Sequence, residues 1–340
     1  MTAREERAGV KDLSVAVIIP VHNDAGWLPE CLAAVGREAQ PRGWEVVVVD
    51  DASTDRSAEI AEEAEVRVIR LAENRGVSVS RNTGAHAVSA DILVFVDSDV
   101  VPEPGCLQAM VDILNRRPEV HAVGAYPLPG DLSPEWSSHF VGLRSAWGYH
   151  WEKGETERPF SSIQSECGAI RSEVFRELGG FVEWYGGVGM EEFHMSHEME
   201  RRGYGHLLLR SAAYKHHYKR LCRRCRALMD RTARWVPLVV RRKKFESRGA
   251  VGTLDAAASA VLTMLILAGL VGGLAWCPLW AFTAIMLLIQ MVIERRFLSF
   301  SARIYGPGMV VYALFALQAL NLAIGAGFIY GLYKYWAKER

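Results

Sequence analysis

One short segment constrains the fold more than any other: Asp91–Asp99, in which the apolar run Leu93–Val96 leads directly into Asp97-Ser98-Asp99. Such a run is typical of a strand buried on both faces. In α/β folds, ligands bind at the edge formed by the carboxyl ends of these strands. Residues i and i+2 of a strand point the same way, so both carboxylates can reach one cation, and hard oxygen ligands suit Mg²⁺ or Mn²⁺. The alternative is a strand-end turn with two solvated carboxylates.

Strand-like and helix-like segments alternate at short spacing in the first third of the chain. This order is typical of a mainly parallel sheet with helices on both faces. The predicted strands are Val15–Pro20, Glu45–Val49, Val66–Leu71 and Ile92–Val96. The predicted helices are Trp27–Gln40, Asp55–Ala64, Val77–Ala90 and Gly105–Arg116.

Polar residues follow three of these strands, as His22-Asn23, Asp50-Asp51 and Asp97-Ser98-Asp99. In a parallel sheet these ends lie along one edge, which favours a nucleotide site over three unrelated helix caps. No Gly-x-Gly-x-x-Gly pattern follows the first strand, and the chain has no Walker loop. Both absences argue against dinucleotide enzymes and P-loop enzymes.

Four linked segments, in this order and spacing, resemble the family 2 glycosyltransferases. They are Val17–Asn23, Val48–Asp55, Asn74–Gly84 and Phe95–Asp99. The resemblance runs from about residue 13 to 210 and implies an α/β GT-A fold, a nucleotide-sugar-binding domain with a mainly parallel, Rossmann-like sheet. It also implies a nucleotide-sugar donor, carrying UDP or GDP, and a divalent metal, Mg²⁺ or Mn²⁺.

The resemblance assigns roles to individual residues. Asp97 and Asp99 match the metal-binding pair, and Asp51 matches the aspartate that contacts the nucleotide base. The full set implied to contact the nucleotide is Pro20, Val21, Asn23, Asp51, Arg81 and Asp97. A divalent metal suits this chemistry, because the departing nucleoside diphosphate gains negative charge.

Further along, Cys167-Gly168-Ala169 resembles the acceptor-side strand of the family. Glu191-Glu192 stands where the family usually has Glu-Asp, whose second carboxylate removes the proton of the acceptor hydroxyl. We therefore expect Glu192 to be the catalytic base of an inverting displacement, with Glu191 as second candidate. The alternative is a pair of first-turn helix acids favoured by the helix dipole.

The net charge of zero hides a strong asymmetry. Residues 1–214 carry 20 Lys+Arg and 34 Asp+Glu, whereas residues 215–340 carry 19 and 5. The C-terminal part also contains three uncharged apolar runs: Ala256–Ala275, Leu279–Ile293 and Met309–Tyr330. A run of about 20 apolar residues spans a bilayer. The sequence therefore predicts about three transmembrane helices after an acidic globular domain.

Between the two parts, residues 215–248 hold 13 Lys+Arg and 2 acids. Apolar residues at helical spacing, from Leu221 through Leu228 to Trp235, predict a basic amphipathic helix lying on the membrane surface. A solvated run of charge is the alternative. Nucleic acid is not expected as a partner, because membrane lipids already account for the basic charge.

These features predict five parts: an N-terminal tail 1–12, a GT-A domain 13–214, an interfacial segment 215–250, a transmembrane region 251–333 and a tail 334–340. No cleavable signal sequence is visible, and six scattered cysteines fit a reducing compartment. We therefore expect a multi-pass protein of the bacterial inner (plasma) membrane with a cytosolic catalytic domain.

The leading functional hypothesis is an inverting, metal-dependent glycosyltransferase. Its acceptor would be membrane-associated, such as a polyprenyl phosphate or a glycolipid, with a growing glycan fitting almost as well. A short polysaccharide synthase is the second enzymatic hypothesis, although three spans are few for a channel. A hypothesis from another class is an inactive membrane scaffold that binds nucleotide sugar, favoured only by Glu192 in place of aspartate.

Overall fold

A computed structural model describes residues 13–130, 132, 135–149, 155–159, 163–183, 191–242 and 254–338. The predicted tail at residues 1–12 lies outside this range. The chain divides into two compact units. The sheet unit comprises the described residues of Met1–Leu128 and Trp151–His217, and the helical unit those of Pro129–His150 and Tyr218–Arg340.

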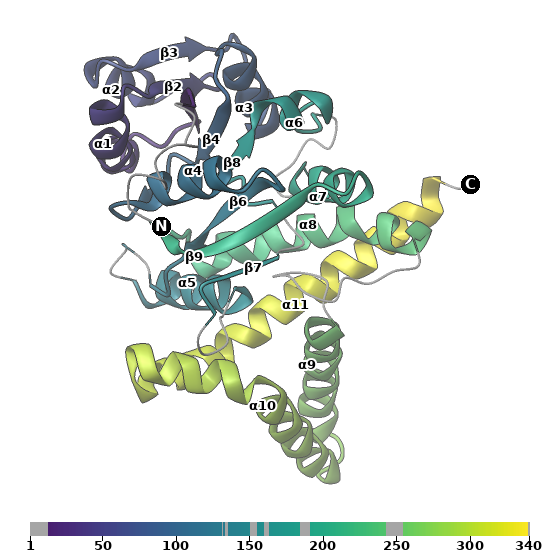
Figure 1. The fold of residues 1–340 in the computed structure, drawn as a ribbon. Coiled ribbons are helices and arrows are strands. Elements are labelled where there is room, and N and C mark those ends of the chain that lie inside the picture. The colour runs from purple at the N-terminus through teal and green to yellow at the C-terminus, as the bar shows by residue number, and fades with distance from the viewer. Residues whose placement is uncertain are drawn as a thin grey trace. The chain divides into compact units, whose positions relative to one another are not determined.

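One mixed sheet organises the sheet unit (Figure 1). Along its main path the strand order is β3-β2-β1-β4-β8-β6-β9-β5, and β7 also pairs with β9. The strands β3, β2, β1 and β4 are mutually parallel, whereas β8 runs antiparallel to both β4 and β6. The bounds are β1 Val15–Val21, β2 Glu45–Asp50, β3 Arg67–Arg70, β4 Ile92–Val96, β5 Val100–Pro102, β6 Val120–Pro127, β7 Glu157–Pro159, β8 Cys167–Arg171 and β9 Gly205–His216. The α/β GT-A-like fold class and the four predicted N-terminal strands are confirmed.

Helices cover both faces of this sheet, as the two-sided burial of the strands requires. Val17 and Ile19 of β1 pack with α1 and α4 on one face, whereas Ile18 packs with α3 residues on the other. This alternation follows from the two-residue period of a strand. The helices are α1 Leu28–Ala39, α2 Ser57–Glu63, α3 Val77–His86, α4 Cys106–Arg116, α6 Ser172–Glu177 and α7 Glu191–Arg201.

The short strand β5 was not predicted, and it positions the site. The chain leaves β4 at Val96, passes through Asp97-Ser98-Asp99 and enters β5 at Val100. There Val100 pairs with His216 at the end of β9, and the backbone amide of His217 donates to the carbonyl of Asp99 over 2.9 Å. This register brings residues more than one hundred positions apart to one edge of the sheet.

The helical unit gathers α5 Trp136–Gly148, α8 Leu221–Arg242, α9 Leu254–Gly273, α10 Pro278–Tyr305 and α11 Pro307–Lys338. Helix α5 lies within the predicted GT-A range 13–214, yet it belongs to this unit. The reason is its apolar face: Phe140 and Leu143 are fully buried in a cluster with Phe297 and Met309. The predicted domain limits thus differ from the observed units at residues 129–150.

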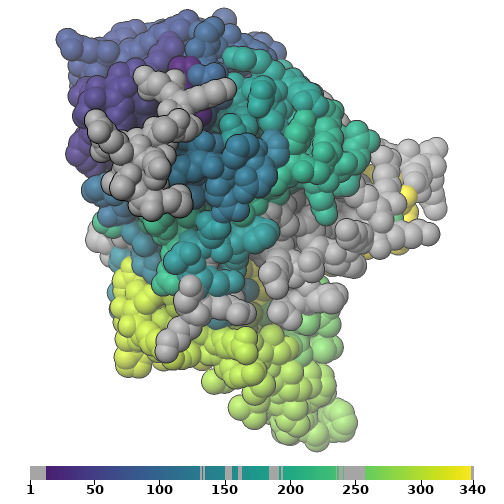
Figure 2. All heavy atoms as spheres, in the orientation of Figure 1, coloured from purple at the N-terminus to yellow at the C-terminus, as the bar shows by residue number. Residues whose placement is uncertain are grey.

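In the described chain, one helix is long and apolar enough to cross a membrane, Pro307–Ala337 of α11. Ala257–Gly273 of α9 is apolar but shorter. The middle predicted run lies in α10, whose residues (yellow-green) form part of the surface in Figure 2. Within that run the large apolar side chains Ile285 and Leu288 are exposed. C-terminal membrane association is therefore supported by one helix, and the predicted multi-pass arrangement is not supported.

Helix α8 forms as predicted, but its apolar face contacts protein. Leu228, Ala233 and Val236 are buried, and α11 passes so close that a Cβ on Gly327 would stand 2.4 Å from the carbonyl oxygen of Met229. Arg223, Arg226 and Arg234 point outward and are exposed. The prediction that the apolar face rests on lipid therefore does not hold in this structure, since α11 covers it.

Candidate active site

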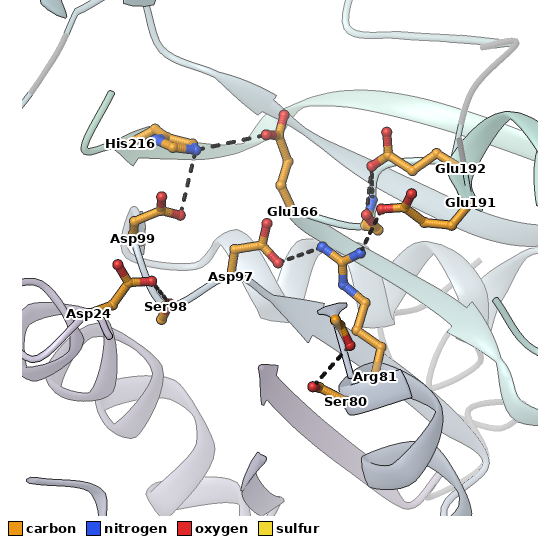
Figure 3. Close-up of polar contacts among 12 residues, drawn as sticks. Asp24, Ser80, Arg81, Asp97, Ser98, Asp99, Glu166, Glu191, Glu192 and His216 are labelled. Atoms are coloured by element: carbon orange, nitrogen blue, oxygen red, sulfur yellow. Dashed lines mark hydrogen bonds and ion pairs between the residues drawn. The ribbon is translucent and has the colours of Figure 1, made fainter. Parts of the chain in front are cut away.

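The Asp97–Asp99 turn is fixed by hydrogen bonds at the carboxyl end of β4 (Figure 3). The Asp97 amide donates to the carbonyl of Glu166 over 2.9 Å, which ties the turn to the residue before β8. The Ser98 hydroxyl donates to Asp24 Oδ2 over 2.6 Å. Ser98 is buried, whereas the side chains of Asp97 and Asp99 keep 25% and 14% of their exposure. The two predicted metal ligands thus stand on a rigid turn.

Asp99 faces a histidine that the sequence did not single out. His216 Nε2 lies 3.6 Å from Asp99 Oδ1 and 3.9 Å from Glu166 Oε2. Glu166 in turn accepts a hydrogen bond of 2.6 Å from the Tyr214 hydroxyl. The antiparallel pairing of β5 with β9 creates this group, and local sequence held no signal for it beyond the position of His216 in a basic stretch.

Arg81 from α3 lies in the centre of the site and is almost fully buried. Its guanidinium donates to Asp97 Oδ1 over 2.6 Å and to Glu191 Oε1 over 3.3 Å, and it stacks over the Phe181 ring at 5.5 Å. Burial alone lowers the pKa of Arg81, but the charges of Asp97 and Glu191 outweigh it and hold that pKa raised. Arg81 therefore stays cationic and links the predicted metal turn to the first turn of α7.

The two adjacent glutamates of α7 have different environments. Glu191 is buried against Arg81, whereas Glu192 Oε1 accepts two hydrogen bonds from Ser165, from its amide over 3.0 Å and its hydroxyl over 2.6 Å. Burial, followed by the negative charges of Glu191 and Glu166, raises the pKa of Glu192 from 4.5 to about 7. Ser165 and Arg81 oppose that rise. A carboxyl group whose pKa is raised toward neutral pH by burial and neighbouring charge is typical of acid–base sites.

The predicted nucleotide residues lie at the same sheet edge, on the ends of β1 and β2. Both carboxylate oxygens of Asp51 accept backbone amides, from Arg75 over 2.7 Å and from Gly76 over 2.8 Å. Asn23 adopts a left-handed conformation (φ 57°), and its side-chain oxygen accepts the Thr54 amide over 2.7 Å. Asp51 and Asn23 therefore fix the loops around the ends of β1 and β2.

Pro20 and Val21 are buried at the end of β1, where they pair with β2. On the predicted acceptor side, Cys167 and Ala169 also have buried side chains, on the face of β8 that packs with α4. Gly168 points the other way, and a Cβ there would stand 2.1 Å from the carbonyl oxygen of Gln164. Glycine at 168 thus permits the close passage of Gln164–Glu166 beside the site.

The residues at the turn fit a divalent metal in their chemistry. Asp97 and Asp99 offer hard carboxylate oxygens, and His216 offers an imidazole nitrogen. Among the described residues, however, no group of three such side chains stands ready to hold an ion, and Asp97 is turned toward Arg81. Asp97, Asp99 and His216 are the residues that would hold a metal here.

Residues 16–179, about half of the chain, match the family described as Glycosyl transferase family 2. The chain carries a family 2 glycosyltransferase domain. Over 128 residues it is 30% identical to the dolichol-phosphate mannosyltransferase of Pyrococcus furiosus, covering 36% of each chain. Over 185 residues it is 28% identical to the pre-mycofactocin glycosyltransferase of Mycobacterium tuberculosis, covering 52% of this chain and 37% of that one.

Among solved structures, a mannosyltransferase from Pyrobaculum calidifontis in complex with GDP-Man and Mn²⁺ aligns over 96% of this chain and 88% of that one. The TM-score is 0.55 at 19% sequence identity, which shows a shared fold. The matched segments span just over a third of the two curated relatives named above. The family 2 resemblance of the sequence motifs is therefore confirmed for the domain.

Proposed function

We propose that this protein is an inverting, metal-dependent glycosyltransferase. It moves a sugar from a UDP or GDP donor to a membrane-associated acceptor such as a polyprenyl phosphate or a glycolipid. The observation that carries the proposal is the placement of Glu192, whose pKa of about 7 suits a general base, directly beside Glu191, which Arg81 links to the Asp97–Asp99 turn.

Each part of the site has a task in this reaction. Pro20, Val21, Asn23 and Asp51 shape the pocket for the nucleotide. Asp97, Asp99 and His216 would hold Mg²⁺ or Mn²⁺, which when bound would offset the charge of the departing nucleoside diphosphate. Glu192 accepts the proton of the acceptor, and Glu191 holds Arg81 in place.

The acceptor side rests on three lines of support. Gly168 lets Gln164–Glu166 pass close to α7, while Cys167 and Ala169 anchor β8 in the core. Helix α11 is long and apolar enough for membrane association, and the exposed basic face of α8 suits anionic lipid. One relative is named for a dolichol-phosphate acceptor. We propose the bacterial inner membrane as location, with the sheet unit on the cytosolic side, and no nucleic-acid partner.

Donor binding and metal binding can be tested together by thermal shift, because a ligand that binds the folded state raises its apparent stability. The full chain would be titrated with GDP-mannose and UDP-glucose, each with and without Mn²⁺. We expect one donor to raise the melting temperature in the presence of metal and Asp99→Ala to abolish that rise. Asp112→Ala, on the exposed side of α4, is the control. A metal-dependent rise that survives in Asp99→Ala would remove this turn as the metal site.

A further inference from the structure

We infer that the acceptor nucleophile is a neutral hydroxyl, as on a sugar or glycolipid, and not a lipid phosphate. This rests on the proposed transferase function and narrows its acceptor class. Three observations carry it: the orientation of Glu192 by Ser165, the carboxylates of Glu191 and Glu166 beside Glu192, and the ion pairs of Arg81 with Asp97 and Glu191.

The two acceptor classes make opposite demands on a site. A hydroxyl must lose its proton as it attacks, so it needs a base within hydrogen-bond reach. A phosphate monoester already carries about −1.5 to −2 charges at neutral pH, so it needs no base and instead needs cations, most often Arg or Lys. The side chains around the proposed base therefore distinguish a hydroxyl acceptor from a phosphate acceptor.

The groups that face Glu192 are mostly acidic. Glu191 comes from α7 itself, Glu166 from the residue before β8, and Arg81 from α3. Arg81 is almost fully buried and divides its donors between Asp97 and Glu191. A phosphate entering beside Glu192 would meet these carboxylates, whereas a hydroxyl carries no charge and would meet only a hydrogen-bond acceptor.

Ser165 places one carboxylate oxygen of Glu192 and leaves the other for the acceptor. Both donors of Ser165 converge on Oε1, and Ser165 itself is buried. Ser196 stabilises this geometry through two hydrogen bonds. Its hydroxyl donates to the Glu192 carbonyl over 2.6 Å and accepts a hydrogen bond from the Ile163 amide over 2.7 Å. Ser165 is thus a positioning residue, which acts on the acceptor through Glu192.

The step balances with a hydroxyl acceptor. The acceptor oxygen forms a bond to the anomeric carbon of the donor sugar, and the bond from that carbon to the diphosphate oxygen breaks. The hydroxyl proton passes to Glu192, and the nucleoside diphosphate leaves with the electron pair of the broken bond. No oxidant, reductant or further reactant is required.

The test measures nucleoside diphosphate release by the full chain with Mn²⁺ and whichever of GDP-mannose or UDP-glucose it turns over. The acceptors are water alone, an octyl glycoside and citronellyl phosphate, a short isoprenoid phosphate. We expect the octyl glycoside to accelerate release and yield a disaccharide product, and citronellyl phosphate to leave the water rate unchanged. Faster release with citronellyl phosphate, yielding a sugar phosphodiester, would overturn the inference.

The variants test the base and its positioning. Ser165 donates to the ionised form of Glu192, so Ser165→Ala should raise the pKa of Glu192 and move the acid limb of the pH–rate profile to higher pH. The rate should fall about tenfold at pH 6 and recover to within about twofold at pH 9. Ser172→Ala is the control. It also removes a buried hydroxyl, but that hydroxyl has no hydrogen-bond partner among the described residues, so the pH–rate profile should stay unchanged.

A second readout needs no turnover. The hydrogen bonds from Ser165 are stronger to a charged carboxylate, so Ser165→Ala should lower the melting temperature more at pH 8.5 than at pH 5. An equal loss at both pH values, or a rate loss that does not depend on pH, would overturn the positioning role. Failure of every donor to react with any acceptor would instead overturn the transferase function, and this inference with it.

Discussion

Replacing Glu192 by glutamine should make the protein more stable at alkaline pH while it abolishes transfer. Glutamine has nearly the same shape as protonated glutamate, and its side-chain oxygen can accept both hydrogen bonds from Ser165. It carries no charge into the half-buried site beside Glu191 and Glu166. The charge of Glu192 is therefore a cost to folding that the substitution removes.

The size of this cost follows from the pKa of Glu192, which rises from 4.5 to about 7 on folding. A tenfold change in proton affinity corresponds to about 1.4 kcal/mol, so ionised Glu192 destabilises the folded state by up to about 3 kcal/mol. For a folded unit of about 150 to 250 residues, such as the sheet unit, a stabilisation of about 2 to 3 kcal/mol corresponds to a rise in melting temperature of about 4 to 12 °C.

The stabilisation that Glu192→Gln produces depends on pH between about 4.5 and 7. Below pH 4.5 the carboxyl is protonated in both folded and unfolded states, so Glu192→Gln should have little effect. Between pH 4.5 and 7 the folded state binds the proton more tightly, so wild-type stability falls as the pH rises and the advantage of glutamine grows. Above pH 7 the advantage should stay constant.

The assay is thermal unfolding of the purified full chain at pH 4.5 and pH 8, followed by circular dichroism. Glu191→Gln is the matched control with the opposite sign, because it leaves Arg81 with one buried partner fewer. Equal effects of Glu192→Gln at the two pH values would refute the reasoning, as would stabilisation by Glu191→Gln in its place.

Three further predictions concern the support of the site and of the helical unit. Gly168→Ala should destabilise the sheet unit by about 2 kcal/mol and reduce turnover, because its Cβ would collide with the carbonyl of Gln164; thermal unfolding and a rate assay check this. Asn82→Ala should cost about 2 to 3 kcal/mol in thermal unfolding, since the Asn82 side chain donates to the carbonyl of Phe181 and accepts its amide in a buried position. Asn321→Leu should destabilise the helical unit by about 1 to 2 kcal/mol in detergent, because Ser259 and Thr263 on α9 would stay buried and lose the donor that Asn321 supplies. Unchanged unfolding would show that this polar cluster does not hold the helices together.

The fold of the first 120 residues was predictable because its signals are local. β4 and the helix α4 were expected at nearly their observed bounds from apolar runs and turn residues alone. β5 was missed because three residues carry too little pattern, and because this strand exists through its pairing with β9. The grouping of α5 with the C-terminal helices was also missed, since it depends on which apolar surface its buried face meets.

The sequence by itself determined the strand that ends in Asp97 and Asp99, the family of the domain and the two glutamates at 191 and 192. These follow from short motifs and from the period of apolar residues, which need no knowledge of distant contacts. Only the tertiary structure decided which glutamate is tied to Arg81 and which is held by Ser165, and that His216 faces Asp99. Strand register and burial set these contacts between residues far apart in the chain, and burial beside like charges sets the proton affinity of Glu192.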